Sequence, residues 1–249
     1  MQVVAFISGK GGVGKTTLAA NVAIALAQKK RRVLLIDLDM QNALRLHLGM
    51  DPGDIAGIAR EGISSKSIFK SPFGVKFIPF GIVLKHELEE FEAVLKQDPH
   101  WVRDRIFSLD RRAFDFVMLD TPPGPSVYLQ QALLAAHHAL GIVLADAASF
   151  ATVPRLFSLV EEYTKANRHF AGFKLLVNQI SEQSELGNQM RLALRADYGK
   201  RIVPISIHHA QAVSEALAFE QPVLKYDAAC KASQDIQYLA DWLLTNTEP

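Results

Sequence analysis

The chain has 249 residues, of which 49% are hydrophobic and 21% charged, and its formal net charge is +1. This balance is typical of a globular protein, and the length suits one α/β domain over residues 1–249. Because the net charge is near zero, no global field favours nucleic acid or a membrane surface. The single cysteine, Cys230, excludes an intramolecular disulfide. With no run of 18 uncharged apolar residues and no cleavable leader, we expect a protein of the reducing cytoplasm.

Apolar runs alternate with helical patterns along the whole chain. This alternation is the signature of a doubly wound α/β fold, with a mostly parallel sheet and helices on both faces. The runs are nearly continuous in Val, Ile, Leu and Phe, as expected for strands that are covered on both sides. We expect about seven or eight strands, and the runs that can be placed are 2–8, 32–37, 75–79, 114–120, 140–145, 173–178 and 202–206.

The first predicted strand leads into a glycine-rich loop, and a helix is predicted over 16–29. Gly9, Gly14, Lys15 and Thr16 satisfy the P-loop pattern G-x-x-x-x-G-K-[ST]. Glycines let such a loop turn its N–H groups toward a phosphate, and the helix start adds free donors. We expect Lys15 to reach the β- and γ-phosphates of a nucleotide and the Thr16 hydroxyl to bind Mg²⁺. The candidate binding residues of the loop are Gly9, Lys10, Gly11, Gly12, Val13, Gly14, Lys15, Thr16 and Thr17.

A second lysine, Lys10, directly follows the first glycine of the loop. With it the loop resembles the deviant Walker A motif, K-G-G-x-x-G-K-[ST], of the ParA/MinD family of dimeric ATPases. The resemblance implies a P-loop fold, ATP and Mg²⁺ as cofactors, and an ATP-dependent homodimer. In that family the extra lysine crosses the interface to the partner's ATP, so Lys10 joins Lys15 as a catalytic candidate. The alternative is a solvated loop lysine.

The second predicted strand ends in two carboxylates, Asp37 and Asp39. Alternation along an extended chain points both the same way, one toward the water shell of a metal and one toward an attacking water. The family carries D-x-D here, and its second aspartate helps to position the hydrolytic water, which makes Asp39 the catalytic candidate and Asp37 a metal candidate through water. The family continues D-x-D-P-Q-G-N. Here Met40 replaces the proline and one residue is missing, so the geometry of the loop is an open question.

The run 114–120 ends in Asp120 and is followed by Thr-Pro-Pro-Gly. An apolar strand that ends in aspartate after a P-loop is the Walker B arrangement, which places a carboxylate beside Mg²⁺. The segment D-x-P-P-G also matches the ParA/MinD family, where it responds to the γ-phosphate. We therefore expect Asp120 to act on the metal through water, beside Thr16.

The residues expected to lie beside the base of the nucleotide are assigned by resemblance alone. Asn178 ends the sixth predicted strand, at a place where the family can hydrogen-bond adenine, and a plain turn-forming asparagine is the alternative. The stretch around Pro204 resembles the base-side loop of the family. No N-K-x-D motif follows a strand, so ATP is expected in preference to GTP.

The remaining helices are expected over 85–109, broken near Pro99, over 126–139, and at the C-terminus, whereas 51–72 reads as short helices and loops. The terminal helix has an apolar face, but Asp235, Asp241 and Glu248 oppose anionic lipid, so it is expected to close the core. No intrinsic membrane anchor is therefore expected. The histidine pairs at 137–138 and 208–209 lack partners at metal-ligand spacing.

Several stretches resemble one branch of this family, encoded with bacterial cellulose synthase. They are residues 42–46, 77–81, 207–208, 216–223 and 239–244. The resemblance implies a slowly hydrolysing ATP switch for assembly, regulation or polar localisation of the cellulose secretion complex. Its implied partners are small accessory proteins, which would recruit it to the inner face of the membrane or the cell pole. The alternatives are a plasmid or chromosome partitioning ATPase, although nucleic acid is not expected as a partner, and a non-hydrolysing ATP-bound scaffold.

Overall fold

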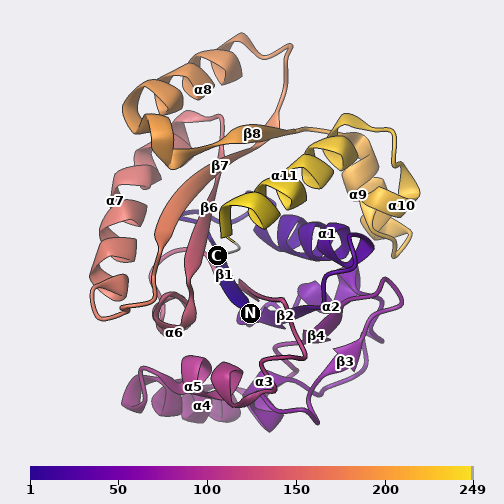
Figure 1. Cartoon of the computed structure of the whole chain (residues 1–249), viewed down its shortest axis with the longest axis vertical. Helices are drawn as coiled ribbons and strands as arrows, with labels where there is room; N and C mark the ends of the chain where they lie inside the picture. Colours follow the sequence, from indigo (N-terminus) through magenta and orange to yellow (C-terminus); the bar gives the residue numbers. More distant parts are fainter. Residues whose placement is uncertain (248–249) are drawn as a thin grey trace.

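A computed structural model describes residues 1–247, so that Glu248 lies outside the described part. Its centre is an eight-stranded sheet in the order β3-β4-β2-β5-β1-β6-β7-β8, in which the edge strand β3 is antiparallel to β4 and the other pairs are parallel (Figure 1). The strands are β1 (Gln2–Ile7), β2 (Val33–Asp37), β3 (Phe69–Lys70), β4 (Lys76–Ile78), β5 (Phe116–Asp120), β6 (His138–Leu144), β7 (Gly172–Ile180) and β8 (Ile202–His208). The predicted fold class is therefore confirmed.

Helices cover both faces of this sheet (Figure 1). The helices are α1 (Lys15–Gln28), α2 (Leu44–His47), α3 (Ile58–Glu61), α4 (Lys85–Gln97), α5 (Trp101–Ser108), α6 (Val127–Ala135), α7 (Ala147–Thr164), α8 (Glu185–Tyr198), the 3₁₀ turn η1 (Gly199–Arg201), α9 (Gln211–Ala218), α10 (Val223–Tyr226) and α11 (Lys231–Thr247). Side chains of β1 alternate between two cores. Val3, Ala5 and Ile7 pack with α4 to α7, whereas Val4 and Phe6 pack with α1 and α11. The central strand is thus buried on both faces.

The terminal helix α11 closes the second core, as predicted. Ile236, Leu239 and Leu243 are buried against α1 and β8. On its outer side, Asp241 forms an ion pair of 2.7 Å with Lys29 at the end of α1. Within residues 1–247, no helix is both long and apolar enough to cross a membrane.

Two sequence predictions need correction. The segment 51–72 contains, besides the short helix α3, the edge strand β3, which consists of two residues and leaves no periodic signal. The predicted helix over 126–139 runs four residues too far, and β6 begins at His138 rather than at residue 140. The helix ends at Ala135 because the His137 backbone N–H donates to Val3 O of the neighbouring strand at 2.8 Å. Tertiary pairing therefore overrides the local helical pattern.

The strand order places the chemically interesting residues together. β1 leads into the glycine-rich loop, and β2 and β5 end in Asp37 and Asp120, which face each other in the strand register. Carboxyl ends of parallel strands form one edge of a sheet, where ligands of open α/β sheets bind.

Candidate functional site

The loop between β1 and α1 has a conformation that its glycines make possible. Gly12 and Gly14 lie in the left-handed region, at φ 75° and 81°. A Cβ atom on Gly9 would lie 2.8 Å from the Thr152 side chain of α7, and one on Gly14 would lie 2.6 Å from the Asn178 amide. Within the described residues no side chain caps the N-terminus of α1, and its first turn carries no acid. The first N–H groups of α1, beside Thr16 and Thr17, are therefore available to an anion.

Lys15 forms a buried ion pair at the end of β5. Its Nζ donates to Asp120 Oδ1 at 2.7 Å, and the two side chains are 6% and 0% exposed. Burial raises the pKa of Asp120, and the charge and hydrogen bond of Lys15 oppose that rise. The second oxygen, Oδ2, is buried and has no hydrogen-bond partner in the part of the chain that the structure describes. An orphaned carboxylate oxygen at this place can accept a hydrogen bond from a ligand or its water.

Asp37 lies beside Asp120, with its side chain fully buried. Its two oxygens accept the backbone N–H groups of Asp39 at 2.9 Å and Leu44 at 3.2 Å. Burial, and next the charge of Asp120, raise the pKa of Asp37 well above its usual range. Asp39 Oδ1 accepts the Gln41 N–H at 3.0 Å and so closes a turn of its own loop. The structure thus brings together Lys15, Asp37 and Asp120.

Lys10 is held by a residue that the sequence reasoning missed. Its Nζ lies 2.9 Å from Asp146 Oδ2, and the two side chains are 32% and 40% exposed. Asp146 is the N-cap of α7, because its other oxygen accepts the Ser149 N–H at 2.6 Å. The signal that could have located this cap is an aspartate after a strand with serine three residues on. Its pairing with Lys10 joins positions 136 residues apart, which no local pattern encodes.

Next to the loop lies a cavity of about 450 Å³. Its walls come from the glycine-rich loop, the ends of β7 and β8, α9 and α11. The lining residues are Gly12, Gly14, Thr17, Leu18, Asn178, Gln179, Ile207, His208, His209, Ala210, Val213, Ser214, Leu217 and Ile236. Most of the wall from residues 207 to 217 was not predicted, because turns and amphipathic helices of this kind carry no specific motif.

The two residues assigned to the base have different positions. Asn178 is 4% exposed and lines this cavity, and its amide Nδ2 donates to Val13 O of the loop at 2.7 Å. Pro204 is exposed in the middle of β8, four residues before the end of the strand, and it is not among the lining residues. Among residues 1–247, no group of three or more His, Cys, Asp or Glu could by itself hold a metal ion, the two histidine pairs included.

Comparisons with known proteins identify the family of this chain. The family described as cellulose biosynthesis protein BcsQ matches residues 1–244. Cellulose biosynthesis protein BcsQ of Salmonella typhi is 26% identical over 98% of this chain and 94% of its own length. Cell division protein PomZ of Myxococcus xanthus is 27% identical over 96% of this chain and 76% of its own.

A solved structure extends the likeness to three dimensions. The septum site-determining protein MinD of Pyrococcus horikoshii, complexed with Mg-ADP, has a TM-score of 0.79 and 24% identity, over 98% of this chain and 97% of the other. At this identity the likeness shows the fold. The match to the family covers nearly all of the chain, and the chain, which has the fold of MinD, therefore belongs to the cellulose biosynthesis protein BcsQ family.

Proposed function

We propose that this protein is a cytoplasmic ATP switch, built as a single P-loop ATPase domain, that dimerises with ATP and hydrolyses it slowly. The observation that carries the proposal is the buried Lys15–Asp120 pair beside the uncapped start of α1. A buried cation that faces one oxygen of a carboxylate, with free N–H donors next to it, is suited to a polyphosphate. The adjacent cavity of about 450 Å³ offers room for a nucleoside, with Asn178 in its wall.

The residues present also fit Mg²⁺. Asp120 Oδ2 is buried without a partner in the described chain, and Asp37 lies beside it. Mg²⁺ prefers oxygen ligands and keeps several waters, so Thr16 would bind it directly and the two aspartates through water. When bound, the ion neutralises charge on the phosphates. Lys15 would then move from Asp120 to the β- and γ-phosphates, and Asp39 would orient the attacking water.

Dimerisation rests on Lys10 and on the family. Lys10 lies on the loop with a third of its side chain exposed, so that it can reach a second subunit once it leaves Asp146. Its match to the deviant Walker A lysine supports a role across the interface. A related MinD from Aquifex aeolicus has been solved as a MinC:MinD complex, and we propose that this chain likewise acts through partner proteins.

Membership of the BcsQ family supports a role in assembly, regulation or polar localisation of the cellulose secretion complex. Small accessory proteins of that machinery would recruit the switch to the inner face of the membrane or the cell pole. The likeness to PomZ keeps a positioning ATPase as a second candidate. A non-hydrolysing scaffold is the third, and Met40 in place of the family proline directly after Asp39 keeps it as a candidate.

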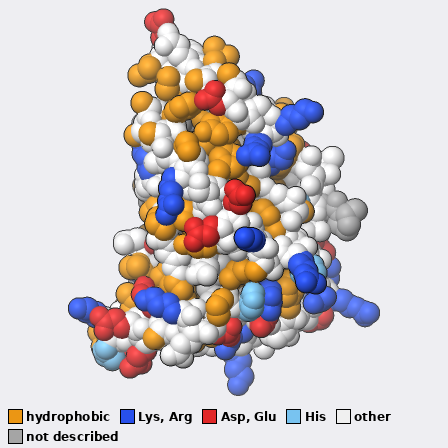
Figure 2. All heavy atoms as spheres, turned by 90° about the vertical axis from the view of Figure 1, so that its left-hand side faces the viewer, with side chains coloured by type: hydrophobic (Ala, Val, Ile, Leu, Met, Phe, Trp, Pro, Cys, Tyr) orange, Lys and Arg blue, Asp and Glu red, His pale blue; other side chains and the backbone are white. Residues whose placement is uncertain are grey.

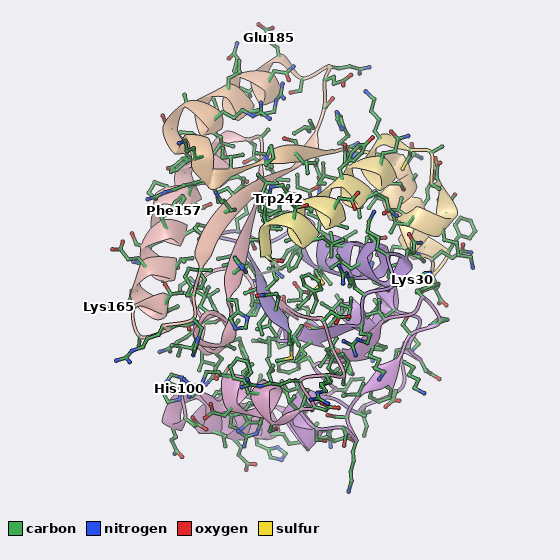
Figure 3. The ribbon with its side chains drawn as sticks, in the orientation of Figure 1. Lys30, His100, Phe157, Lys165, Glu185 and Trp242 are labelled. Carbon is green, nitrogen blue, oxygen red and sulfur yellow. The ribbon has the colours of Figure 1, made fainter. Side chains whose placement is uncertain are left out.

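Calorimetry of Mg-ATP binding tests the proposal. Lys15→Ala should weaken binding at least about 100-fold, because charge-assisted contacts to two phosphates contribute about 1.5–3 kcal/mol each. The control is Lys165→Ala, at the exposed end of α7 near the rim of the molecule (Figure 3). Because removal of Lys15 leaves Asp120 buried and unpaired, Lys15→Gln and a thermal unfolding curve accompany it. Folded Lys15 variants that bind ATP like the parent would refute the assignment.

A further inference from the structure

A second cavity lies at the β8 edge of the sheet. It has a volume of about 270 Å³ and is bounded by α8, by β8 and by the start of α11. In Figure 3 its helix α8 begins at the labelled Glu185. The lining residues are Ile180, Glu182, Asn188, Arg191, Arg195, Pro204, Ile205, Ser206, His208 and Asp235. The proposed ATPase does not use this cavity.

Helical spacing builds the cationic wall of this cavity. Asn188, Arg191 and Arg195 are three and seven residues apart on α8, so their side chains share one face of the helix. In the part of the chain that the structure describes, the side chain of neither arginine forms an ion pair or a hydrogen bond. Two guanidinium groups therefore line the cavity without a counter-charge.

Two buried polar atoms in the cavity wall lack partners. They are Arg191 Nε and Ser206 Oγ, and neither has a hydrogen-bond partner among residues 1–247. An arginine stays protonated and can only donate, so a buried Nε–H without an acceptor is costly and calls for an explanation. A ligand that brings oxygen atoms into the cavity would satisfy both atoms.

The acids that line the same cavity already have partners. Asp235 Oδ2 accepts the His208 backbone N–H at 2.8 Å and lies 2.7 Å from its ring Nδ1. Glu182 Oε1 accepts from Lys231 Nζ at 2.9 Å. These acids limit the positive charge of the cavity, so that one negative charge suits it better than a dianion or a polyanion.

We propose that this cavity docks an aspartate or glutamate side chain of a partner protein. The Nε and Nη edge of arginine matches the two oxygens of a carboxylate, and Arg191 lines the cavity with its Nε unpaired and covered, so that a small rotation of the guanidinium would offer that edge to a carboxylate. A recessed donor is within reach of a side chain, whereas the backbone of a nucleic acid duplex stays on the outer surface. Leu186 and Leu192 on α8 are 61% and 62% exposed. In Figure 2, hydrophobic side chains are grouped at the upper end of the visible face of the molecule, where α8 lies. The partner segment is thus acidic with apolar neighbours.

The position of the cavity gives this docking a consequence. His208 lines both this cavity and the larger one beside the glycine-rich loop. Its ring is fixed by Asp235, which belongs to the docking cavity. His208 is therefore shared by the walls of the docking cavity and of the cavity proposed for the nucleotide. The docking site goes beyond the proposed switch and holds whether or not ATP is hydrolysed.

NMR of the ¹⁵N-arginine-labelled full chain tests the proposal, with two probes. Butyrate, which carries one carboxylate like the glutamate side chain, should shift the Arg191 Nε–H signal saturably, with an affinity on the order of millimolar. The peptide acetyl-Leu-Glu-Leu-amide should shift the same signal at lower concentration, because its leucines add apolar contacts beside the cavity. Acetyl-Leu-Gln-Leu-amide should leave it unchanged.

Two variants distinguish recognition of a carboxylate by the paired donors of Arg191 from attraction to its positive charge alone. Arg191→Lys keeps the charge but lacks the Nε donor, so we expect at least about tenfold weaker binding of both probes. Binding to this variant is followed at the Nε–H signal of Arg195, which lines the same cavity and which the parent titration calibrates. Arg168→Gln removes an exposed arginine elsewhere and should change nothing. Equal binding by Arg191→Lys would overturn the proposal, as would uniform, non-saturating shifts of all arginines. Tighter binding of inorganic phosphate or of a DNA duplex at Arg191 would also overturn it, in favour of a phosphate site.

Discussion

The ion pair between Lys10 and Asp146 should act as a brake on dimerisation. If Lys10 acts across the interface, it must first leave Asp146, which it contacts at 2.9 Å within its own chain. A pair that is 32% and 40% exposed is worth about 0.2–1 kcal/mol after solvent screening. A dimer breaks two such pairs, so the brake amounts to about 0.4–2 kcal/mol, or about 2- to 30-fold in the dimer dissociation constant.

Asp146→Asn isolates this effect. Asparagine caps helices about as well as aspartate, so the bond to the Ser149 N–H that begins α7 is kept while the charge is lost. We expect tighter dimerisation of the variant in Mg-ATP by sedimentation equilibrium at low salt. The gain should shrink in 0.5 M salt, because the Debye length at that ionic strength is below about 5 Å and the ion pair is screened.

A matched control breaks another surface ion pair. Asp241→Asn removes the pair with Lys29, which is 27% and 56% exposed and lies between α11 and α1. It should leave dimerisation unchanged, and Lys10→Ala should bind ATP yet dimerise poorly. If Asp146→Asn dimerises no better than the parent at low salt while Lys10→Ala is impaired, the pair is no brake. The reasoning about Lys10 leaving Asp146 would then be wrong.

Three further predictions concern hydrolysis, packing and pH. Asp39→Ala should keep ATP affinity but slow single-turnover hydrolysis by about 10²–10⁴-fold; an unchanged rate with a partner present would favour the scaffold. Gly57→Ala should cost about 2–4 kcal/mol in denaturant unfolding, because its Cβ would lie 2.3 Å from the Gly81 backbone nitrogen. Gly172→Ala, whose Cβ meets nothing within 4 Å, is the control, and equal losses would contradict the argument. Burial lowers the pKa of His47 from 6.5 to about 4, so the unfolded chain binds more protons in that window. The free energy of unfolding should therefore fall by up to about 3 kcal/mol as the pH drops from about 6.5 to about 4, and it should fall less in His47→Gln. If the parent and His47→Gln lose the same stability over this range in denaturant unfolding, the argument is wrong.

The sequence could predict the parts of the site that parallel-strand geometry brings together. Asp37 and Asp120 end two strands, and such ends meet at one edge of the sheet, so their proximity follows from local patterns alone. The glycine-rich loop could be placed for the same reason. Asp146 could not be paired with Lys10, because a helix cap has a local signal but its contact across 136 residues has none.

Other features depend on packing that sequence periodicity does not encode. The helix α6 ends early because His137 pairs with β1, with Val3 N–H donating to His137 Nδ1 at 2.9 Å. The assignment of Asn178 to adenine stays a prediction, and in the structure its amide Nδ2 donates to Val13 O at 2.7 Å, a contact across 165 residues that no local pattern encodes. The wall between residues 207 and 217 combines apolar side chains with His208, His209 and Ser214, and it comes from a strand end, a turn and helix α9, none of which carries a specific motif.

The loop after β2 departs from the family pattern D-x-D-P-Q-G-N, and other residues of this chain hold it in place. Met40 stands where the family has proline, and Asn42 takes the left-handed conformation at φ 51° that glycine would adopt easily. Asn42 Oδ1 accepts the Phe80 backbone N–H at 3.1 Å, just past the end of β4. With its side chain 4% exposed, this asparagine fixes the far end of the loop to the sheet.

The near end of the same loop depends on one buried carboxylate. Asp37 accepts the N–H groups of Asp39 and Leu44, and it lies opposite Asp120 at the strand ends. Because the Asp37 carboxylate accepts the Asp39 N–H, the position of Asp39 depends directly on that of Asp37. Asn42 holds the same loop farther along through its bond to the Phe80 N–H. Asp39 thus lies between two fixed points of the loop, and if Mg²⁺ were held near Asp37 and Asp120, this geometry would keep the Asp39 carboxylate close to it.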